Sequence, residues 1–291
     1  MKKFILTSVI LFQLFNSHKT FSEIKNNNSD STAKDSLYFF TTSTLFVPTE
    51  TSIIESKVGV TKYTDDKNLK LDIGVSFDLI GLKANKIKYS FGVDFFTFSN
   101  LRSESNFKFP VDAIDYMFGI NFNFRKNYSK KLDLAGRFRV SHISSHFEDG
   151  HIYKRTDTIF TPVVFSKEFL DFAVESDFIL AKNFYMKSML SLNYIFHSIP
   201  EDAKGISGQL GLQFRYFVTN YMSLYVADNI ELASVYSVSN LNNNFESGIS
   251  FGMLNTRSIN LFFTYYDGQD YRGQYYGDYL GNTGLGLRIK F

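Results

Sequence analysis

The segment RFRVSHISSHFEDGH, residues 137–151, places a histidine and a serine two positions apart, at His142 and Ser144. In a β-strand, residues two positions apart project from the same face. A histidine beside a serine hydroxyl can act as a general base, and the serine can then attack an ester as a nucleophile. These residue types at this spacing therefore raise the hypothesis of ester hydrolysis, provided that the segment is a strand.

The composition excludes several other chemistries. The chain of 291 residues has no cysteine, which removes disulfides, zinc–thiolate sites and thiol nucleophiles. Its 31 Lys and Arg residues nearly balance 29 Asp and Glu residues, so we expect no nucleic-acid partner, which would need a basic excess. Aromatic residues make up 18%, yet the mean hydropathy of -0.13 excludes a bundle of membrane helices. This combination is typical of a wall with one apolar and one polar face.

Most of the chain alternates between apolar and polar residues with period two. Residues 116–124 alternate Tyr, Phe, Ile, Phe and Phe with Met, Gly, Asn and Asn, and residues 284–291 alternate Gly, Gly, Arg and Lys with Leu, Leu, Ile and Phe. The predicted strands are about 10 to 14 residues long, whereas soluble strands favour about 5 or 6. We predict strands near 52–62, 69–81, 86–99, 112–125, 131–144, 167–181, 183–197, 206–218, 221–233, 245–255, 258–267 and 279–291.

The predicted connections are short on one side and mostly longer on the other. Long strands, this asymmetry and a final strand at the chain end indicate a transmembrane β-barrel of the bacterial outer membrane, with the long loops extracellular. The predicted fold is therefore all-β, an antiparallel up-and-down barrel of about 12 strands. Its inward charges would either plug the lumen or line a narrow channel, and their mixed sign favours plugging.

The first residues have the pattern of a secretory signal peptide. A basic start at Lys2 and Lys3 precedes an apolar run that is too short to span a bilayer stably. We predict a signal peptide over 1–22, a disordered periplasmic leader over 23–44 and the barrel over 45–291. A membrane anchor is the alternative to the signal peptide. The strand-like piece 37–46 is a periplasmic lead-in, a plug, or an extra strand.

Strand parity assigns the two candidate catalytic residues to the lipid side. Arg137 and Arg139 belong in the lumen, because arginine is costly on the lipid face. His142 and Ser144 have the opposite parity and therefore project outward near the extracellular rim.

Two other interpretations of this segment remain open. His142 and Ser144 can be ordinary polar residues at the edge of the apolar band. The same region can instead bind a ligand or a metal ion, and the candidate residues for that role are His142, His146, Glu148, Asp149 and His151. No cofactor is expected, although oxygen-rich loops could hold a calcium ion.

The His-x-Ser pair on an outward strand face resembles outer-membrane phospholipase A and the lipid A 3-O-deacylases. That resemblance implies hydrolysis of acyl esters in outer-leaflet lipids, which would make outer-membrane lipid a partner. In those families a third polar residue, on or near the next strand, orients the histidine, and an Asn or Gly commonly follows the serine. Here Ser145 and His146 follow, so the match is partial. The candidates for the third residue that the resemblance implies are Glu148, Asp149 and Asp157.

A second resemblance covers residues 45–291. The strings SHISSHFEDG and YYDGQDYRGQYYGDYLGNTGLGLRIKF resemble an uncharacterised family of bacterial outer-membrane barrels, a domain of unknown function with a His-x-Ser-Ser-His segment. The resemblance implies the fold and the location but no reaction. The extracellular end of the last hairpin carries Gln269, Arg272 and Gln274. The tyrosines around them are typical of an aromatic girdle. They are candidates for binding a sugar or a lipid headgroup at the rim.

The final strand ends in Phe291, and its resemblance to other outer-membrane barrels implies the barrel-assembly machinery as a partner. Three functions follow from the sequence. The first is acyl ester hydrolysis by the His-x-Ser pair. The alternatives are a small-solute channel and a structural or surface-interaction barrel.

Overall fold

The computed structural model describes residues 35–290 except 42–43, 66–67, 85, 105, 107, 148–153, 156–157, 160–162, 236–237 and 255–256. The chain divides into two compact units, Met1–Ala33 and Lys34–Phe291. The first unit, which includes the predicted signal peptide, lies outside the described residues. In the described part of the chain, no helix is long and apolar enough to cross a membrane.

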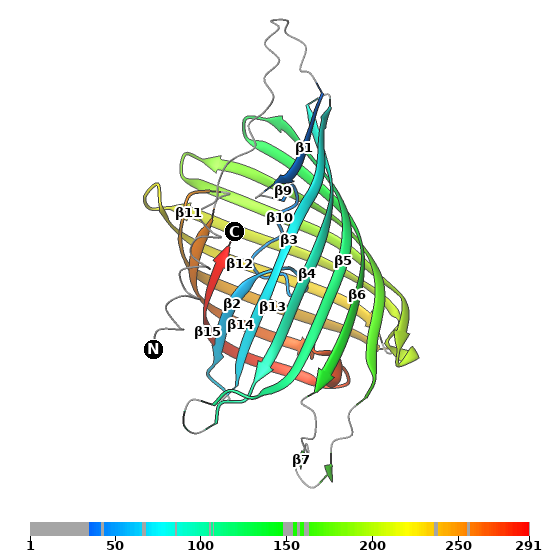
Figure 1. The fold of residues 1–291 in the computed structure, drawn as a ribbon. Coiled ribbons are helices and arrows are strands. Elements are labelled where there is room, and N and C mark those ends of the chain that lie inside the picture. The colour runs from blue at the N-terminus through cyan, green and yellow to red at the C-terminus, as the bar shows by residue number, and fades with distance from the viewer. Residues whose placement is uncertain are drawn as a thin grey trace, which may run out of the picture. The chain divides into compact units, whose positions relative to one another are not determined.

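The second unit is a wall of antiparallel strands (Figure 1). Among the described residues the wall strands are β2 (Val58–Tyr63), β3 (Leu69–Ala84), β4 (Ile87–Leu101), β5 (Val111–Ser129), β6 (Leu132–Phe147), β9 (Phe165–Ala181), β10 (Phe184–Ile199), β11 (Gly205–Phe217), β12 (Met222–Val235), β13 (Val238–Phe251), β14 (Ser258–Gln269) and β15 (Tyr279–Lys290). Strands adjacent in this series pair with one another, and β15 pairs with β2 to close the ring. The prediction of an all-β barrel of 12 strands is confirmed.

The remaining elements are small. β1 (Ser36–Thr41) pairs with β3, and β7 (Lys154–Arg155) and β8 (Thr158–Ile159) form a ribbon in the connection between β6 and β9. η2 (Glu201–Ala203) and η3 (Gly273–Tyr275) are short 3-10 helices. The β7–β8 ribbon lies at the lower end in Figure 1, which we take as the extracellular end because the long connections are there.

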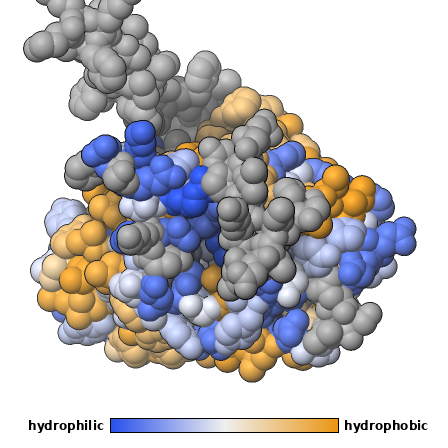
Figure 2. All heavy atoms as spheres, turned by 90° about the horizontal axis from the view of Figure 1, so that it is seen from below, coloured by the Kyte–Doolittle hydropathy of each residue, from blue (hydrophilic) through white to orange (hydrophobic). Residues whose placement is uncertain are grey.

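The two faces of the wall differ as the alternation predicted. On β5, Phe118, Ile120 and Phe122 are 45–52% exposed and point outward, whereas Asn121 and Asn123 are buried inside. Figure 2, which looks onto the lower end, shows hydrophilic residues toward the middle and hydrophobic residues along much of the periphery. An apolar exterior on a closed barrel is the architecture of an outer-membrane protein.

One predicted loop is wrong. Residues 234–244 were expected to connect two strands, but β12 and β13 extend into this range and pair with each other up to Val235 and Val238. The Asn-rich sequence hides the strand, because asparagine is depleted in strands. Here Asn240 and Asn242 donate hydrogen bonds to Gln269 and Glu231, so neighbouring strands satisfy their amides.

Two separate strands, β1 and β2, pair with the same edge of β3. β1 pairs with residues 78–83 of β3, and β2 pairs with residues 69–72 along the same strand. Residues 44–57, here called the inner segment, connect β1 to β2 and lie inside the barrel. The predicted strand over 52–62 is therefore correct only from Val58, where β2 begins. In the strand-like piece over 37–46, residues 37–41 lie in β1 and residues 44–46 begin the inner segment. Strand pairing thus begins within the predicted leader.

The inner segment is not suited to a wall position. Pro48 has no N–H to donate to a strand ladder. The segment instead buries Phe46, which is 3% exposed, against Ala135, Ala173 and Met189. These three residues lie on β6, β9 and β10, so the segment reaches strands far along the wall from β3.

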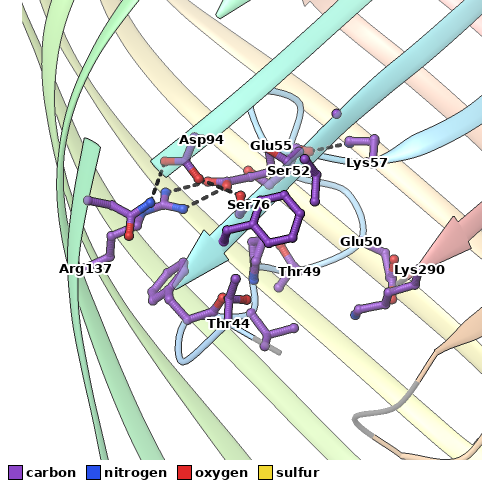
Figure 3. A pocket seen from close by; sticks show the side chains of 18 of the residues that line it. Thr44, Thr49, Glu50, Ser52, Glu55, Lys57, Ser76, Asp94, Arg137 and Lys290 are labelled. Atoms are coloured by element: carbon purple, nitrogen blue, oxygen red, sulfur yellow. Dashed lines mark hydrogen bonds and ion pairs between the residues drawn. The ribbon is translucent and has the colours of Figure 1, made fainter. Parts of the chain in front are cut away.

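A buried carboxylate anchors the middle of the inner segment. The Glu50 oxygens lie 3.2 Å from Arg215, 3.0 Å from Arg288 and 3.2 Å from Lys290. Its backbone N–H donates to the Gln213 side chain at 3.0 Å. Figure 3 shows Glu50 beside Lys290.

A second buried carboxylate anchors the end of the inner segment. The guanidinium of Arg137 donates to both oxygens of Glu55, at 2.8 and 2.5 Å, and to Asp171 at 2.7 Å. Arg139 lies 3.4 Å from Glu55 and donates to the carbonyl of Ile54 at 3.3 Å. Inward arginines predicted to plug the lumen or line a channel therefore hold the inner segment in place.

We predict that Glu55→Ala destabilises the barrel. The substitution removes a carboxylate from two buried guanidinium groups, and breaking such a pair costs about 3–5 kcal/mol. The thermal midpoint of unfolding, read from heat-modifiable mobility and circular dichroism, should therefore fall. Glu104→Ala is the control, because Glu104 has a 49% exposed side chain, 4.0 Å from Arg102, and should change stability by less than about 1 kcal/mol. Equal midpoints for the two variants would contradict the anchoring role.

Candidate functional site

Three titratable side chains meet on the outward face of the wall. His142 lies on β6, Glu168 on β9 and His197 on β10. Nδ1 of His142 lies 2.7 Å from Oε1 of Glu168, and Nδ1 of His197 contacts Oε2 of the same carboxylate. One carboxylate therefore bridges two imidazoles, in what we call the His–Glu–His cluster.

Strand register brings the cluster together. Glu168 is the cross-strand partner of His142 and also of His197. A register shift between Ile195 and His197 makes Phe196 an extra residue in β10. Ile195 is buried, whereas Phe196 and His197 are both exposed. Strict alternation would turn His197 into the lumen, so this bulge re-aims its side chain outward.

Aromatic side chains flank the cluster on the outward face. The side chains of His142, Glu168 and His197 are 43%, 28% and 56% exposed. Phe118, the cross-strand partner of His142 on β5, and Tyr194 on β10 are about half exposed on the same outward face. A carboxylate that faces lipid is unfavourable unless donors satisfy its oxygens. The two imidazoles supply those donors.

Ser144 is the next outward residue of β6 after His142. Two residues along a strand span about 7 Å, so the imidazole and the hydroxyl project side by side. Its cross-strand partners are Tyr116 on β5 and Ser166 on β9. The structure thus places His142 and Ser144 on one outward face, beside Glu168.

The hydrogen bond to Glu168 determines which nitrogen of His142 is available. A carboxylate accepts hydrogen bonds and does not donate them, so Nδ1 carries the proton that binds Glu168. In the neutral ring Nε2 is then the acceptor. His142 can therefore receive a proton at Nε2 while Glu168 holds the ring in place.

The other residues predicted in this region have different positions. His146 projects outward, and its ring centre lies 5.8 Å from the centre of the Tyr116 ring in an edge-on arrangement. Glu148, Asp149 and Asp157, the predicted third residues, lie outside the described residues. Within the described ranges, no group of three His, Asp or Glu side chains is arranged to hold a metal ion.

Sequence reasoning missed Glu168 and His197. Glu168 has the same parity as Leu170 and Phe172, so an acidic residue interrupts an apolar face, and this was a readable signal. His197 had no such signal, because its outward position depends on the bulge after Ile195. Both residues are far from His142 in sequence and meet it only through strand pairing.

The second predicted group, in the connection between β14 and β15, holds that connection together. The residues 270–278 are here called the closing loop. Arg272 donates to both oxygens of Asp270. Although burial opposes it, this carboxylate raises the pKa of Arg272 above its usual value. Gln269 accepts a hydrogen bond from Asn240 at 3.1 Å and donates to the Tyr276 carbonyl at 2.8 Å.

Gln274 anchors the closing loop to the opposite wall. Its side-chain amide donates to the carbonyls of Ser145, at 2.8 Å, and Val163, at 2.9 Å. The adjacent Gly273 N–H donates to the Asp115 carboxylate at 3.0 Å. These contacts bring the two sequence strings together inside the barrel mouth, where Gln274 binds the chain itself.

The closing loop generates a prediction about Gly273. A Cβ atom added there would lie 2.2 Å from the Phe165 ring and 2.7 Å from Cβ of Ser145, so Gly273→Ala should push the loop off the wall. We expect a loss of about 1–3 kcal/mol and faster proteolysis within residues 270–278. Gly277→Ala in the same loop is the matched control, because a Cβ there meets nothing within 4 Å. Equal cleavage rates for the two variants would count against this packing.

Comparison with known proteins finds a family model that matches most of the chain. A family model described as "Protein of unknown function (DUF1207)" matches residues 76–291. No curated protein matches the chain.

Several solved structures have a similar fold. The β domain of the Bordetella autotransporter BrkA has a TM-score of 0.46 at 12% identity, covering 80% of this chain and 97% of its own. An outer membrane channel from Pseudomonas putida F1 has a TM-score of 0.43 at 12% identity, covering 84% and 98%. OmpT of Vibrio cholerae has a TM-score of 0.44 at 8% identity, covering 88% and 99%. Identities this low concern the fold alone.

Proposed function

The chain belongs to the DUF1207 family, and we propose that it hydrolyses acyl esters of outer-leaflet lipids on the outward face of its barrel. In this site Ser144 is the nucleophile, His142 is the general base and Glu168 orients His142. The observation that carries the proposal is the 2.7 Å contact between His142 Nδ1 and Glu168 Oε1, with the outward Ser144 two residues further along β6. Glu168 takes the orienting role for which Asp157 was a sequence candidate.

The proposed reaction has two halves. In the first, Ser144 Oγ attacks the ester carbonyl while His142 Nε2 takes the hydroxyl proton, and the imidazolium then gives that proton to the departing alcohol oxygen. In the second, a water molecule attacks the acyl-serine, His142 accepts a water proton and returns it to Ser144, and the fatty acid leaves. Glu168 keeps Nδ1 protonated and stabilises the imidazolium in both halves.

The position of the site supports a lipid substrate. The cluster faces outward, so an acyl chain in the outer leaflet could approach it without entering the lumen. Phe118, Tyr194 and Phe196 are 44–52% exposed around the cluster and offer an apolar surface for that chain. The ester would then lie near His142 and Ser144, toward the extracellular end of β6.

The resemblance to outer-membrane phospholipase A and the lipid A 3-O-deacylases supports the same proposal. In those families the residue that orients the histidine lies on or near the next strand, and Glu168 lies on β9, the next wall strand after β6. The lumen offers less support for a channel, because the inner segment crosses it and is held by buried ion pairs.

The test is acyl release by purified, detergent-folded protein from phospholipid and from lipid A, with and without calcium. We predict that Ser144→Ala and His142→Ala each lower the rate on the order of 1,000-fold or more. Glu168→Gln should cause a similar loss, because its amide can donate to Nδ1 of His142 and favour the tautomer in which Nε2 is already protonated.

Ser188→Ala is the matched control, because Ser188 lies on β10 near the opposite end of the barrel and hydrogen-bonds to Ser176. It should retain the wild-type rate. Absence of acyl release by the wild-type protein under every condition would overturn the proposal. Release that survives in Ser144→Ala but is lost in Ser166→Ala would overturn Ser144 as the nucleophile.

A further inference from the structure

We infer that His197 is a positioning residue for the proposed site, which fixes the Glu168 carboxylate so that it can orient His142. The inference rests on the proposed function for its catalytic meaning, but its structural content can be measured separately. His197 does not need to touch the substrate, because its Nδ1 is directed at Glu168 Oε2.

A single hydrogen bond does not immobilise a glutamate. The terminal torsion of a Glu side chain is broad, so a carboxylate held by one oxygen can turn about its last bond. Oε1 of Glu168 is bound by His142 on β6, and Oε2 is bound by His197 on β10. Because these strands flank β9 on both sides, the two imidazoles fix the carboxylate in both position and orientation.

The local backbone is shaped to make this second contact. Without the register shift after Ile195, the position of His197 would face the lumen, away from Glu168. With the shift, His197 becomes the cross-strand partner of Glu168 and is exposed on the outward face. An interruption of regular pairing within a membrane wall weakens the ladder locally. Here it brings a second donor to the carboxylate.

The surroundings add a reason for the second donor. On β10, the outward neighbours of His197 are Phe196 and Ile199, whose side chains carry no hydrogen-bond donor. An Oε2 atom without His197 would lack a partner from the described residues on a face where lipid offers none. The carboxylate would then tend to turn toward water at the rim and release His142.

The test compares two substitutions of similar size. His197→Asn keeps an N–H donor the same number of bonds from the backbone as Nδ1, whereas His197→Leu removes it. We predict that His197→Leu lowers kcat about 10- to 100-fold, the factor for losing a hydrogen bond to a charged group, with KM unchanged. His197→Asn should stay within about threefold of wild type, because its amide can replace that bond.

A second readout does not depend on activity. Nitrogen-15 NMR of the folded protein, with the His142 signals assigned by their loss in His142→Ala, should show Nδ1 of His142 protonated and hydrogen-bonded in wild type and in His197→Asn. In His197→Leu that signature should weaken. Folding of each variant is checked by heat-modifiable mobility.

The outcomes separate the two proposals. Wild-type activity in both His197 variants, with unchanged His142 signals, would overturn the role of His197 and leave the proposed hydrolysis standing. Equal losses in the Asn and Leu variants would also overturn it, since the hydrogen bond would not be the cause. If wild-type protein releases no acyl group, the proposed function fails, and the NMR comparison alone still decides whether His197 positions Glu168.

Discussion

The hydrocarbon interior of a membrane offers no hydrogen bonds to a protein backbone, and the architecture of this chain follows from that constraint. The described wall strands pair with a neighbour on either side, and the pairing of β15 with β2 closes the ring. Where the chain leaves the wall, side chains inside the barrel take over. The Val47 N–H donates to Glu175, and the Thr51 carbonyl accepts from Asn244.

The same constraint makes polar groups on the outward face exceptional. The alternation that pairs the backbone also sends every second side chain toward lipid, and most of those side chains are apolar. His142, Glu168 and His197 are tolerated there because each carboxylate oxygen has its own imidazole partner. In the proposed function, the arrangement that lowers the cost of a charge beside lipid also orients His142 as the general base, with Ser144 beside it.

The lumen, unlike the outward face, is lined by charged and polar side chains. It contains many buried charges, and their burial is tolerated because they form ion pairs around the inner segment. Glu50 and Glu55 face arginines and a lysine from widely separated strands. At the other end the closing loop binds the wall through Gln274 and Gly273. The interior therefore holds paired charges around the inner segment, which also lines a pocket with the surrounding wall. The outward face is where we propose that a lipid substrate meets the protein.

Sequence alone determined the barrel, its number of strands and the faces of most residues, because period-two alternation is a local property of the backbone. It also placed His142 and Ser144 on one outward face. Only the tertiary structure decided what accompanies them. Glu168 is 26 residues from His142 and 29 residues from His197 in the chain. The three side chains meet through strand register and a bulge, which depend on pairing between strands. The inner segment was hidden for the same reason, since its partners are charges on distant strands.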